Sequence, residues 1–163
     1  MLEVIPNVLN EDQCYYLTQT YDPDKVEQNS VYHDSSINEY TFNGMRRARC
    51  AQDDLVKTIS ETYGFDTEGA SVLKYSIGAF NPPHADNSII RDGQVVVVKP
   101  WLRTAVVFLN NNFSGGELCY PNQGISIKPT TGTMVVASAG IDFKHYTNIA
   151  DKERYVLVIR INN

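Results

Sequence analysis

Apolar residues recur at helical spacing in two segments, and both lie in the first 65 residues of the chain. The first segment is expected to form a helix over residues 10–21, because Asn10 and Gln13 have the spacing of a capping box. The second is expected over residues 50–63, where apolar side chains share one face and Gly64 provides a stop. The N-terminal part of the chain is therefore predicted to be helical.

From residue 71 onward, short runs rich in β-branched and aromatic residues alternate with turn residues. These runs predict β-strands at residues 72–77, 95–98, 104–109, 125–128, 134–137 and 155–161. Turn signals separate them, at residues 81–83, 92–93, 114–116, 122–124 and 131–132. Helices followed by many short strands predict an antiparallel sandwich or barrel with helices on one outer face. No repeat or linker interrupts the pattern, so one domain is expected over residues 1–163.

Composition favours a folded protein that binds neither membranes nor nucleic acid. The chain has 163 residues, 42% of them hydrophobic, which is enough to bury a core without disulfides. Its formal net charge of −5 repels a phosphate backbone, so a nucleic acid partner is not expected. No apolar run approaches the ~20 residues that cross a bilayer, and the N-terminus has no signal-peptide pattern. A cytoplasmic location is expected because no CxxC spacing occurs among the three cysteines, Cys14, Cys50 and Cys119.

Two histidines and one aspartate are candidate metal ligands. His84 and Asp86 lie two residues apart, so an extended backbone would point both side chains in the same direction. The pair alone could equally be a surface histidine beside a turn aspartate. His145, near the end of the chain, would complete the two-histidine, one-carboxylate facial triad that holds iron(II) and leaves positions open.

Arg154 is a candidate anion-binding residue, because it begins a predicted strand nine residues after His145. An arginine that points into a barrel of β-branched residues needs an anionic partner, and its planar guanidinium suits a carboxylate. The alternative is a solvent-exposed Arg154 at a strand edge, beside Lys152 and Glu153.

The chain from Tyr75 to Arg160 resembles the prolyl 4-hydroxylase superfamily of iron(II) and 2-oxoglutarate-dependent dioxygenases. The matching residues, in order, are 75–78, 84–87, 103–110, 113–118, 128–129, 132, 145 and 154–155. The His-Ala-Asp-Asn sequence and the nine-residue step to Arg154 are most similar to the oxygen-sensing prolyl hydroxylases, whereas collagen-type members usually have a lysine at that position. Two departures bear on substrate choice: Arg160 replaces a frequent tryptophan, and residues 138–141 are smaller than usual.

The resemblance implies a double-stranded β-helix (a jelly roll) over residues 71–163, supported by helices in residues 1–65. It implies that His84, Asp86 and His145 bind Fe(II) and are the catalytic residues. Arg154 would bind the distal carboxylate of 2-oxoglutarate. The implied reaction uses O2, releases succinate and CO2, and hydroxylates a prolyl residue of a peptide or protein. Ascorbate is a further cofactor that the resemblance suggests.

Further residues of the co-substrate pocket follow from the same resemblance. Tyr75 would donate a hydrogen bond to the carboxylate that Arg154 binds; the alternative is a strand tyrosine with a buried ring and a wet hydroxyl. Thr104, with Val106 and Phe108, would line the pocket, although the sequence does not say which face these three take.

Two segments are candidates for closing over a substrate. One is the polar segment 29–49, expected as a long loop or loose hairpin, in which residues 31–49 could form a lid. Its basic residues 45–49 could meet an acidic group or could be a solvated charge run. The other is a loop over residues 87–100, followed by Trp101.

Two other functions stay open from the sequence. One is the same chemistry on a free amino acid or a nucleobase, and the other is a jelly-roll binding module without catalysis. The acidic balance and the absence of an aromatic-basic stripe disfavour the nucleobase. No oligomeric state follows from the sequence.

Overall fold

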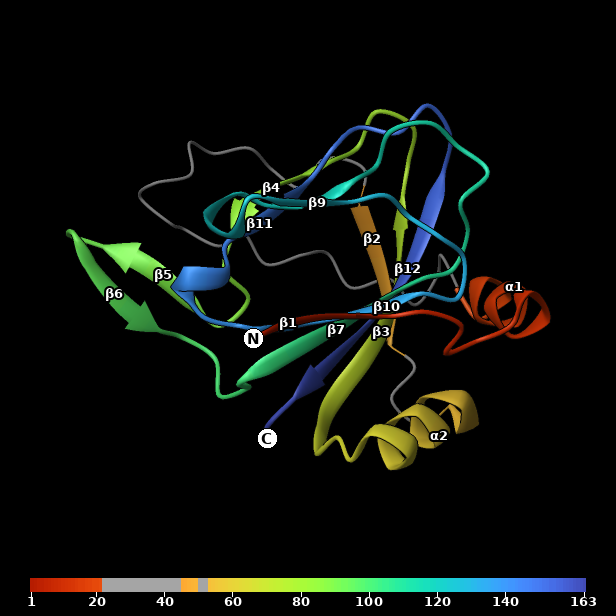
Figure 1. Cartoon of the computed structure of the whole chain (residues 1–163), viewed down its shortest axis with the longest axis horizontal. Helices are drawn as coiled ribbons and strands as arrows, with labels where there is room; N and C mark the ends of the chain where they lie inside the picture. Colours follow the sequence, from red (N-terminus) through yellow and green to blue (C-terminus); the bar gives the residue numbers. More distant parts are fainter. Residues whose placement is uncertain (22–44, 50–52) are drawn as a thin grey trace.

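Two antiparallel sheets form the body of the computed structural model, which describes residues 1–21 and 53–163 and the backbone of residues 45–49. The larger sheet has the order β1-β10-β7-β12-β3-β2. Its strands are β1 (Leu2–Ile5), β2 (Met45–Arg49), β3 (Thr67–Tyr75), β7 (Arg103–Phe108), β10 (Met134–Ser138) and β12 (Arg154–Ile161). The smaller sheet has the order β4-β11-β8-β9 and covers one face of the larger one (Figure 1). Its strands are β4 (Asn81–His84), β8 (Leu118–Tyr120), β9 (Ile125–Ile127) and β11 (His145–Thr147).

Two helices and a separate hairpin complete the fold. The helices α1 (Glu11–Gln19) and α2 (Asp54–Tyr63) lie beside the larger sheet, and the hairpin of β5 (Ser88–Arg91) and β6 (Gln94–Val97) projects at the opposite side (Figure 1). Short 3-10 turns at Pro121–Gln123 and Ile141–Phe143 connect strands. The arrangement confirms the expected jelly roll with helices on one outer face.

Two hydrophobic cores lie on opposite faces of the larger sheet. The outer core joins the helices to the sheet through residues that include Cys14, Leu17, Val56, Ile59, Val72, Val107, Leu157 and Ile159. The inner core lies between the two sheets and includes Leu73, Tyr75, Phe108, Leu118, Tyr120, Val135 and Val156. Because side chains alternate along a strand, each of β3, β7 and β12 contributes to both cores.

The alternation along β12 determines what faces the interior. Leu157 and Ile159 belong to the outer core, so Arg154, Val156, Val158 and Arg160 point the other way, into the jelly roll. On β7, Thr104, Val106 and Phe108 have the same inward orientation. These three side chains therefore face the interior of the jelly roll, an orientation that the sequence alone left open.

The helix signals are largely confirmed. Asn10 and Gln13 exchange the two bonds of a capping box, with N···O distances of 2.8 and 2.9 Å. The helix ends at Gln19, two residues before the expected boundary. The second helix begins later than expected, because Asp53 caps it in place of a start at residue 50, and it ends as expected at a left-handed Gly64.

The expected turn at residues 81–83 is wrong, because these residues belong to strand β4. Proline lacks the N–H that a central strand needs, but among the described strands β4 lies at the edge of its sheet and pairs only with β11. The loop expected over residues 87–100 contains the β5–β6 hairpin instead. Strands β1, β8 and β11 were not predicted, because runs of three or four residues show too little alternation.

The segment 29–49 is only partly described. Residues 45–49 form strand β2, which pairs with β3, where a long loop or a loose hairpin was expected. Residues 29–44, and with them most of the expected lid, lie outside the described residues. In the described part of the chain, no helix is long and apolar enough to span a membrane.

Candidate metal centre

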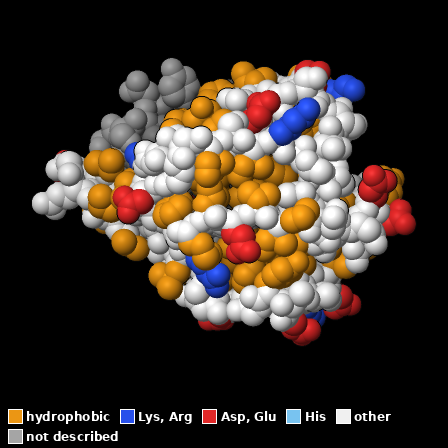
Figure 2. All heavy atoms as spheres, viewed as in Figure 1, with side chains coloured by type: hydrophobic (Ala, Val, Ile, Leu, Met, Phe, Trp, Pro, Cys, Tyr) orange, Lys and Arg blue, Asp and Glu red, His pale blue; other side chains and the backbone are white. Residues whose placement is uncertain are grey.

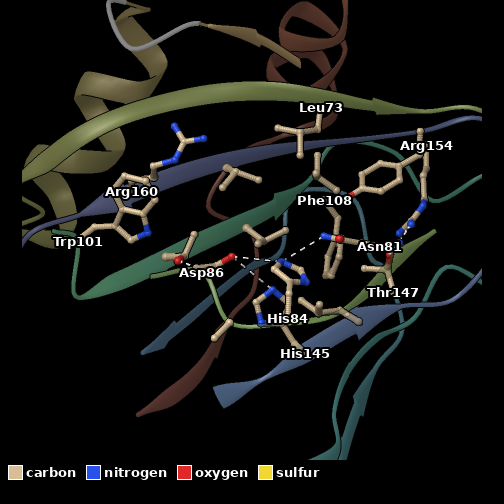
Figure 3. Close-up of a pocket in the computed structure, with 17 residues that line it drawn as sticks. Leu73, Asn81, His84, Asp86, Trp101, Phe108, His145, Thr147, Arg154 and Arg160 are labelled. Atoms are coloured by element: carbon tan, nitrogen blue, oxygen red, sulfur yellow. Dashed lines mark hydrogen bonds and ion pairs between the residues drawn. The ribbon is translucent and has the colours of Figure 1, made fainter. Parts of the chain in front are cut away.

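Strand pairing brings the two candidate histidines together. His84 ends β4, His145 begins β11, and the two residues are direct partners in the antiparallel pair. Asp86 follows β4 and points back at both imidazoles, with its Oδ1 3.3 Å from His84 Nε2 and 3.8 Å from His145 Nε2 (Figure 3). One ligand atom from each of the three residues lies within 4.8 Å of the others, so the group can hold a metal ion.

Both imidazoles are oriented by the backbone. His84 Nδ1 lies 2.8 Å from the carbonyl oxygen of Pro82, and His145 Nδ1 lies 3.1 Å from that of Phe143. A carbonyl accepts only, so each Nδ1 carries a proton, and each Nε2, which faces Asp86, is the atom that can ligate a metal. This is how proteins orient histidines that ligate metals.

The second oxygen of Asp86 is also held. Thr104 donates its hydroxyl hydrogen to Asp86 Oδ2 over 2.6 Å, which leaves Oδ1 facing the histidines. Thr104 therefore lines the predicted pocket, but its hydroxyl contacts the Asp86 carboxylate.

The surroundings shift the pKa values of the three candidate ligands in different directions. Burial lowers the pKa of the His145 imidazole, which disfavours its charged form. Burial acts on His84 in the same sense, but the Asp86 carboxylate outweighs it and the pKa of His84 is raised. At Asp86 burial opposes ionisation, yet the charge of His145 and the bond to His84 hold the pKa of this carboxyl well below its usual range. The Asp86 carboxyl is thus ionised.

Tyr120 packs against the back of the metal centre. Its ring is 2% exposed and lies 5.1 Å from the His145 ring, centroid to centroid. Burial and the nearby Asp86 charge raise the pKa of its hydroxyl, so it stays protonated. We did not predict this contact, and no local pattern in the sequence indicates it.

Arg154 lies at one end of the same pocket and is 2% exposed, so the alternative of a solvent-exposed arginine is wrong. Its guanidinium donates to Thr147 Oγ1 over 2.7 Å and to the Gly116 carbonyl over 3.3 Å, and it lies 3.9 Å from the centre of the Tyr75 ring. Its Nε is buried and has no hydrogen-bond partner among the described residues. Within residues 1–21 and 53–163, no carboxylate pairs with this cation. Burial lowers the pKa of Arg154, but an arginine side chain stays protonated in proteins. A buried positive charge of this kind is expected to bind an anion.

One pocket contains every predicted site residue. It is lined by His84, Asp86, His145, Arg154, Tyr75 and Thr104, and also by Val106 and Phe108. Figure 3 shows the histidines and Asp86 in the middle, Arg154 at one end, and Trp101 with Arg160 at the other. The contacts that Tyr75 and Thr104 would make with a co-substrate stay predictions.

Sequence reasoning missed two polar residues of the pocket. Asn81 lies 3.4 Å from His84 Nε2 through its Nδ2, and Thr147 accepts from both Arg154 and the backbone N–H of Asn81. Thr147 therefore links the arginine to strand β4. Both lie on short strands whose pairing cannot be read from local pattern.

Several solved structures of other proteins share this fold. No protein-family model matches the sequence, and neither does any curated protein. A viral collagen prolyl hydroxylase from Paramecium Bursaria Chlorella virus-1, solved with 2-oxoglutarate, is 16% identical, with a TM-score of 0.71 over 98% of this chain and 94% of that chain. A Trichoplax adhaerens prolyl hydroxylase, in complex with a hypoxia inducible factor peptide fragment, is also 16% identical (TM-score 0.74; 99% and 83% covered).

A third structure, a Pseudomonas putida prolyl-4-hydroxylase, is 20% identical, with a TM-score of 0.66 and coverage of 99% and 93%. At such identities the likeness is one of fold, and it extends over nearly the whole of each chain. The chain therefore has the jelly-roll fold of the prolyl hydroxylases to which it is similar.

Proposed function

We propose that this protein is an Fe(II)- and 2-oxoglutarate-dependent dioxygenase. The observation that carries the proposal is the pairing, in one pocket, of a two-histidine, one-carboxylate triad with a buried arginine that has no anionic partner among the described residues. The triad matches the donor set of iron(II) oxygenases, and the arginine matches the distal carboxylate of 2-oxoglutarate.

The residues of the triad would hold iron on one side and leave its remaining positions open to the pocket. Bound there, Fe(II) supplies the activation of O2 that an unassisted protein side chain cannot provide. His84 and His145 present their Nε2 lone pairs, and Thr104 keeps one Asp86 oxygen away from the metal. The protein thus orients the ligands before the metal binds.

The co-substrate would lie between the metal centre and Arg154. The charged end of the pocket then receives one carboxylate, while the apolar walls formed by Phe108, Leu118 and Val156 exclude water from the reacting groups. In the overall reaction 2-oxoglutarate and O2 become succinate and CO2, and one oxygen atom enters a C–H bond of the prime substrate.

We propose a prolyl residue in a peptide or protein as that substrate. The similar structures are named prolyl hydroxylases, and one of them contains a peptide fragment. In this chain the β5–β6 hairpin exposes Val95 and Val97, and Figure 2 shows hydrophobic side chains on this left part of the molecule, with acidic and basic side chains among them. An exposed apolar hairpin next to the site suits contact with a peptide.

The test is turnover under 18O2 with a library of proline-containing peptides. The proposal predicts succinate release and one labelled oxygen on proline, with no product when the proline is replaced by alanine. A labelled product on a free amino acid or nucleobase, but on no peptide, would contradict the prolyl assignment. Folded, metal-loaded protein that releases no succinate with any substrate would favour a binding module.

Three further features belong to the proposal. We infer a single catalytic domain, because the two cores share the strands of one sheet. The free, buried thiols of Cys14 and Cys119 suit a reducing, cytoplasmic location. Ascorbate would act as a reductant that keeps the iron ferrous, and its omission should shorten the linear phase of succinate release.

A further inference from the structure

Thr147 lies at the Arg154 end of the pocket, on the inner face of a central strand. Strand β11 pairs with β4 on one side and with β8 on the other, so its side chains point alternately into and out of the jelly roll. His145 and Thr147 share the inner face, and both line the pocket. Figure 3 shows Thr147 beside Arg154 and Asn81. Because neighbouring strands cover both edges of β11, the 9% of Thr147 that stays exposed borders the pocket.

Both lone pairs of the Thr147 hydroxyl oxygen are occupied. The backbone N–H of Asn81 donates to Oγ1 over 2.9 Å, and the Arg154 guanidinium donates to it through Nη2 over 2.7 Å. A hydroxyl group has two acceptor lone pairs and one hydrogen. The remaining position around the oxygen therefore carries the hydrogen, and the hydroxyl can make a further bond only as a donor.

In the part of the chain that the structure describes, no atom accepts this hydrogen. The side-chain oxygen of Asn81 has no hydrogen-bond partner, so it is not the acceptor. Glu117, the acidic residue whose charge acts on Arg154, accepts instead from the Asn148 amide over 3.0 Å. A buried donor without an acceptor costs free energy, so the pocket favours an occupant that supplies one.

Arg154 offers further donors directly beside this hydroxyl. Its hydrogen bonds go to Thr147 and to the Gly116 carbonyl, which leaves other N–H groups of the guanidinium without an acceptor among the described residues. The Tyr75 ring, whose centre lies 3.9 Å from the guanidinium carbon, covers one face of the cation. An acceptor bonds at the edge of the guanidinium, where Nη2 lies 2.7 Å from the Thr147 oxygen. Two neighbouring donors of this kind suit the two oxygens of one carboxylate.

We propose that Thr147 is a second binding residue for the anion at this end of the pocket, and that its hydroxyl donates to the same carboxylate that pairs with Arg154. The identification of this carboxylate as the distal group of 2-oxoglutarate rests on the proposed function. Thr147 thus accepts from the arginine, which orients it, and donates to the ligand. The site therefore selects a carboxylate over an apolar group of the same length.

Anaerobic calorimetric titration of Mn(II)-loaded protein measures this binding without turnover. The ligands are 2-oxoglutarate and 2-oxopentanoate, which has a methyl group in place of the distal carboxylate. Thr147→Val keeps the shape of the side chain and removes the hydroxyl. We expect it to weaken 2-oxoglutarate binding at least about tenfold, because a hydrogen bond to a charged group is lost, and to leave 2-oxopentanoate binding unchanged. Thr147→Ser, which keeps the hydroxyl, should bind both ligands like the wild type.

A double-mutant cycle separates donation to the ligand from orientation of Arg154. If Thr147 acted only by orienting the arginine, its replacement would have no effect in Arg154→Ala protein. We expect Thr147→Val to weaken 2-oxoglutarate binding in that background as well, by at least about threefold. An effect confined to protein that contains Arg154 would overturn the proposal.

The matched control is Thr133→Val, since Thr133 is also buried but lies outside the pocket. Its 2-oxoglutarate affinity should equal that of the wild type. Valine at position 147 leaves two N–H donors without an acceptor, so Thr147→Ala, which leaves room for water there, carries the same prediction if the valine variant does not fold. Unchanged Mn(II) affinity shows that the metal centre is intact. Equal losses for the two ligands, or no loss for 2-oxoglutarate, would overturn the role of Thr147.

Succinate release, measured in parallel with Fe(II), separates this inference from the proposed function. Binding of 2-oxoglutarate that depends on the Thr147 hydroxyl, without succinate release, would support the site and contradict the dioxygenase. Succinate release with an affinity that is independent of the hydroxyl would overturn the site and leave the dioxygenase intact. No binding of 2-oxoglutarate to folded, metal-loaded protein would overturn both.

Discussion

At the scale of single residues, the candidate metal centre is held in place by neighbours that are not themselves candidate ligands. The Pro82 and Phe143 carbonyls set the tautomers of the two histidines, and Thr104 holds one oxygen of Asp86. These contacts decide which lone pairs face the open position, and partners of this kind tune metal affinity strongly.

Thr104→Val tests this dependence. Valine has nearly the same shape but cannot donate to Asp86, so metal affinity should fall roughly 10–100-fold while the protein stays folded. Calorimetric titration with Mn(II) under anaerobic conditions measures the change. Thr133→Val is the control, since Thr133 is also buried but does not line the pocket. Equal affinities for the two variants would contradict the role of Thr104.

At the scale of elements, the pairing of β4 with β11 creates the site, and this is also where sequence reasoning was weakest. The ligands, Arg154 and the inward pocket residues could be named from motif and resemblance, because their types and spacing are local features. The pairing of His84 with His145 is a long-range contact that no local pattern contains. The prolines before His84 indicated a turn, and only the edge position of β4 explains why they fit a strand.

Connections between the strands depend on glycines with positive φ. Gly132 has φ of +79°, and an added Cβ would collide with the Leu9 carbonyl oxygen, whereas Gly124 has φ of +65° and open space around it. Gly124→Ala should therefore cost only backbone strain, about 1–2 kcal/mol, and Gly132→Ala should cost more than about 3 kcal/mol in free energy of unfolding. Urea unfolding of both variants compares them. Equal costs would show that the backbone at Leu9 moves aside without penalty.

At the scale of the whole molecule, the site ties the two sheets together. Strands β4 and β11 of the smaller sheet supply the histidines, while Thr104 and Arg154 come from the larger one. A metal that binds the folded chain but not the unfolded chain must stabilise the entire structure.

Thermal unfolding with Mn(II) at a hundred times its dissociation constant should show about 2.7 kcal/mol of added stability. Asp86→Asn should lose this gain, because an amide is a poor substitute for the carboxylate ligand. Asp92→Asn is the control, since Asp92 lies at the exposed hairpin tip in a left-handed conformation that asparagine tolerates. If Mn(II) stabilised the Asp86→Asn variant as much as the wild type, the metal would have to bind at another site.

The most direct test of the dioxygenase assignment is an anaerobic titration of the Fe(II)-loaded protein with 2-oxoglutarate, followed by visible absorbance. The account predicts the weak charge-transfer band of the chelated co-substrate in the wild type. In Arg154→Ala, the 2-oxoglutarate concentration that gives half of the band should rise at least about 30-fold. The reason is that loss of a buried charge partner costs about 2–5 kcal/mol. Absence of the band in folded, metal-loaded wild type, or the same titration midpoint in the variant, would contradict the account.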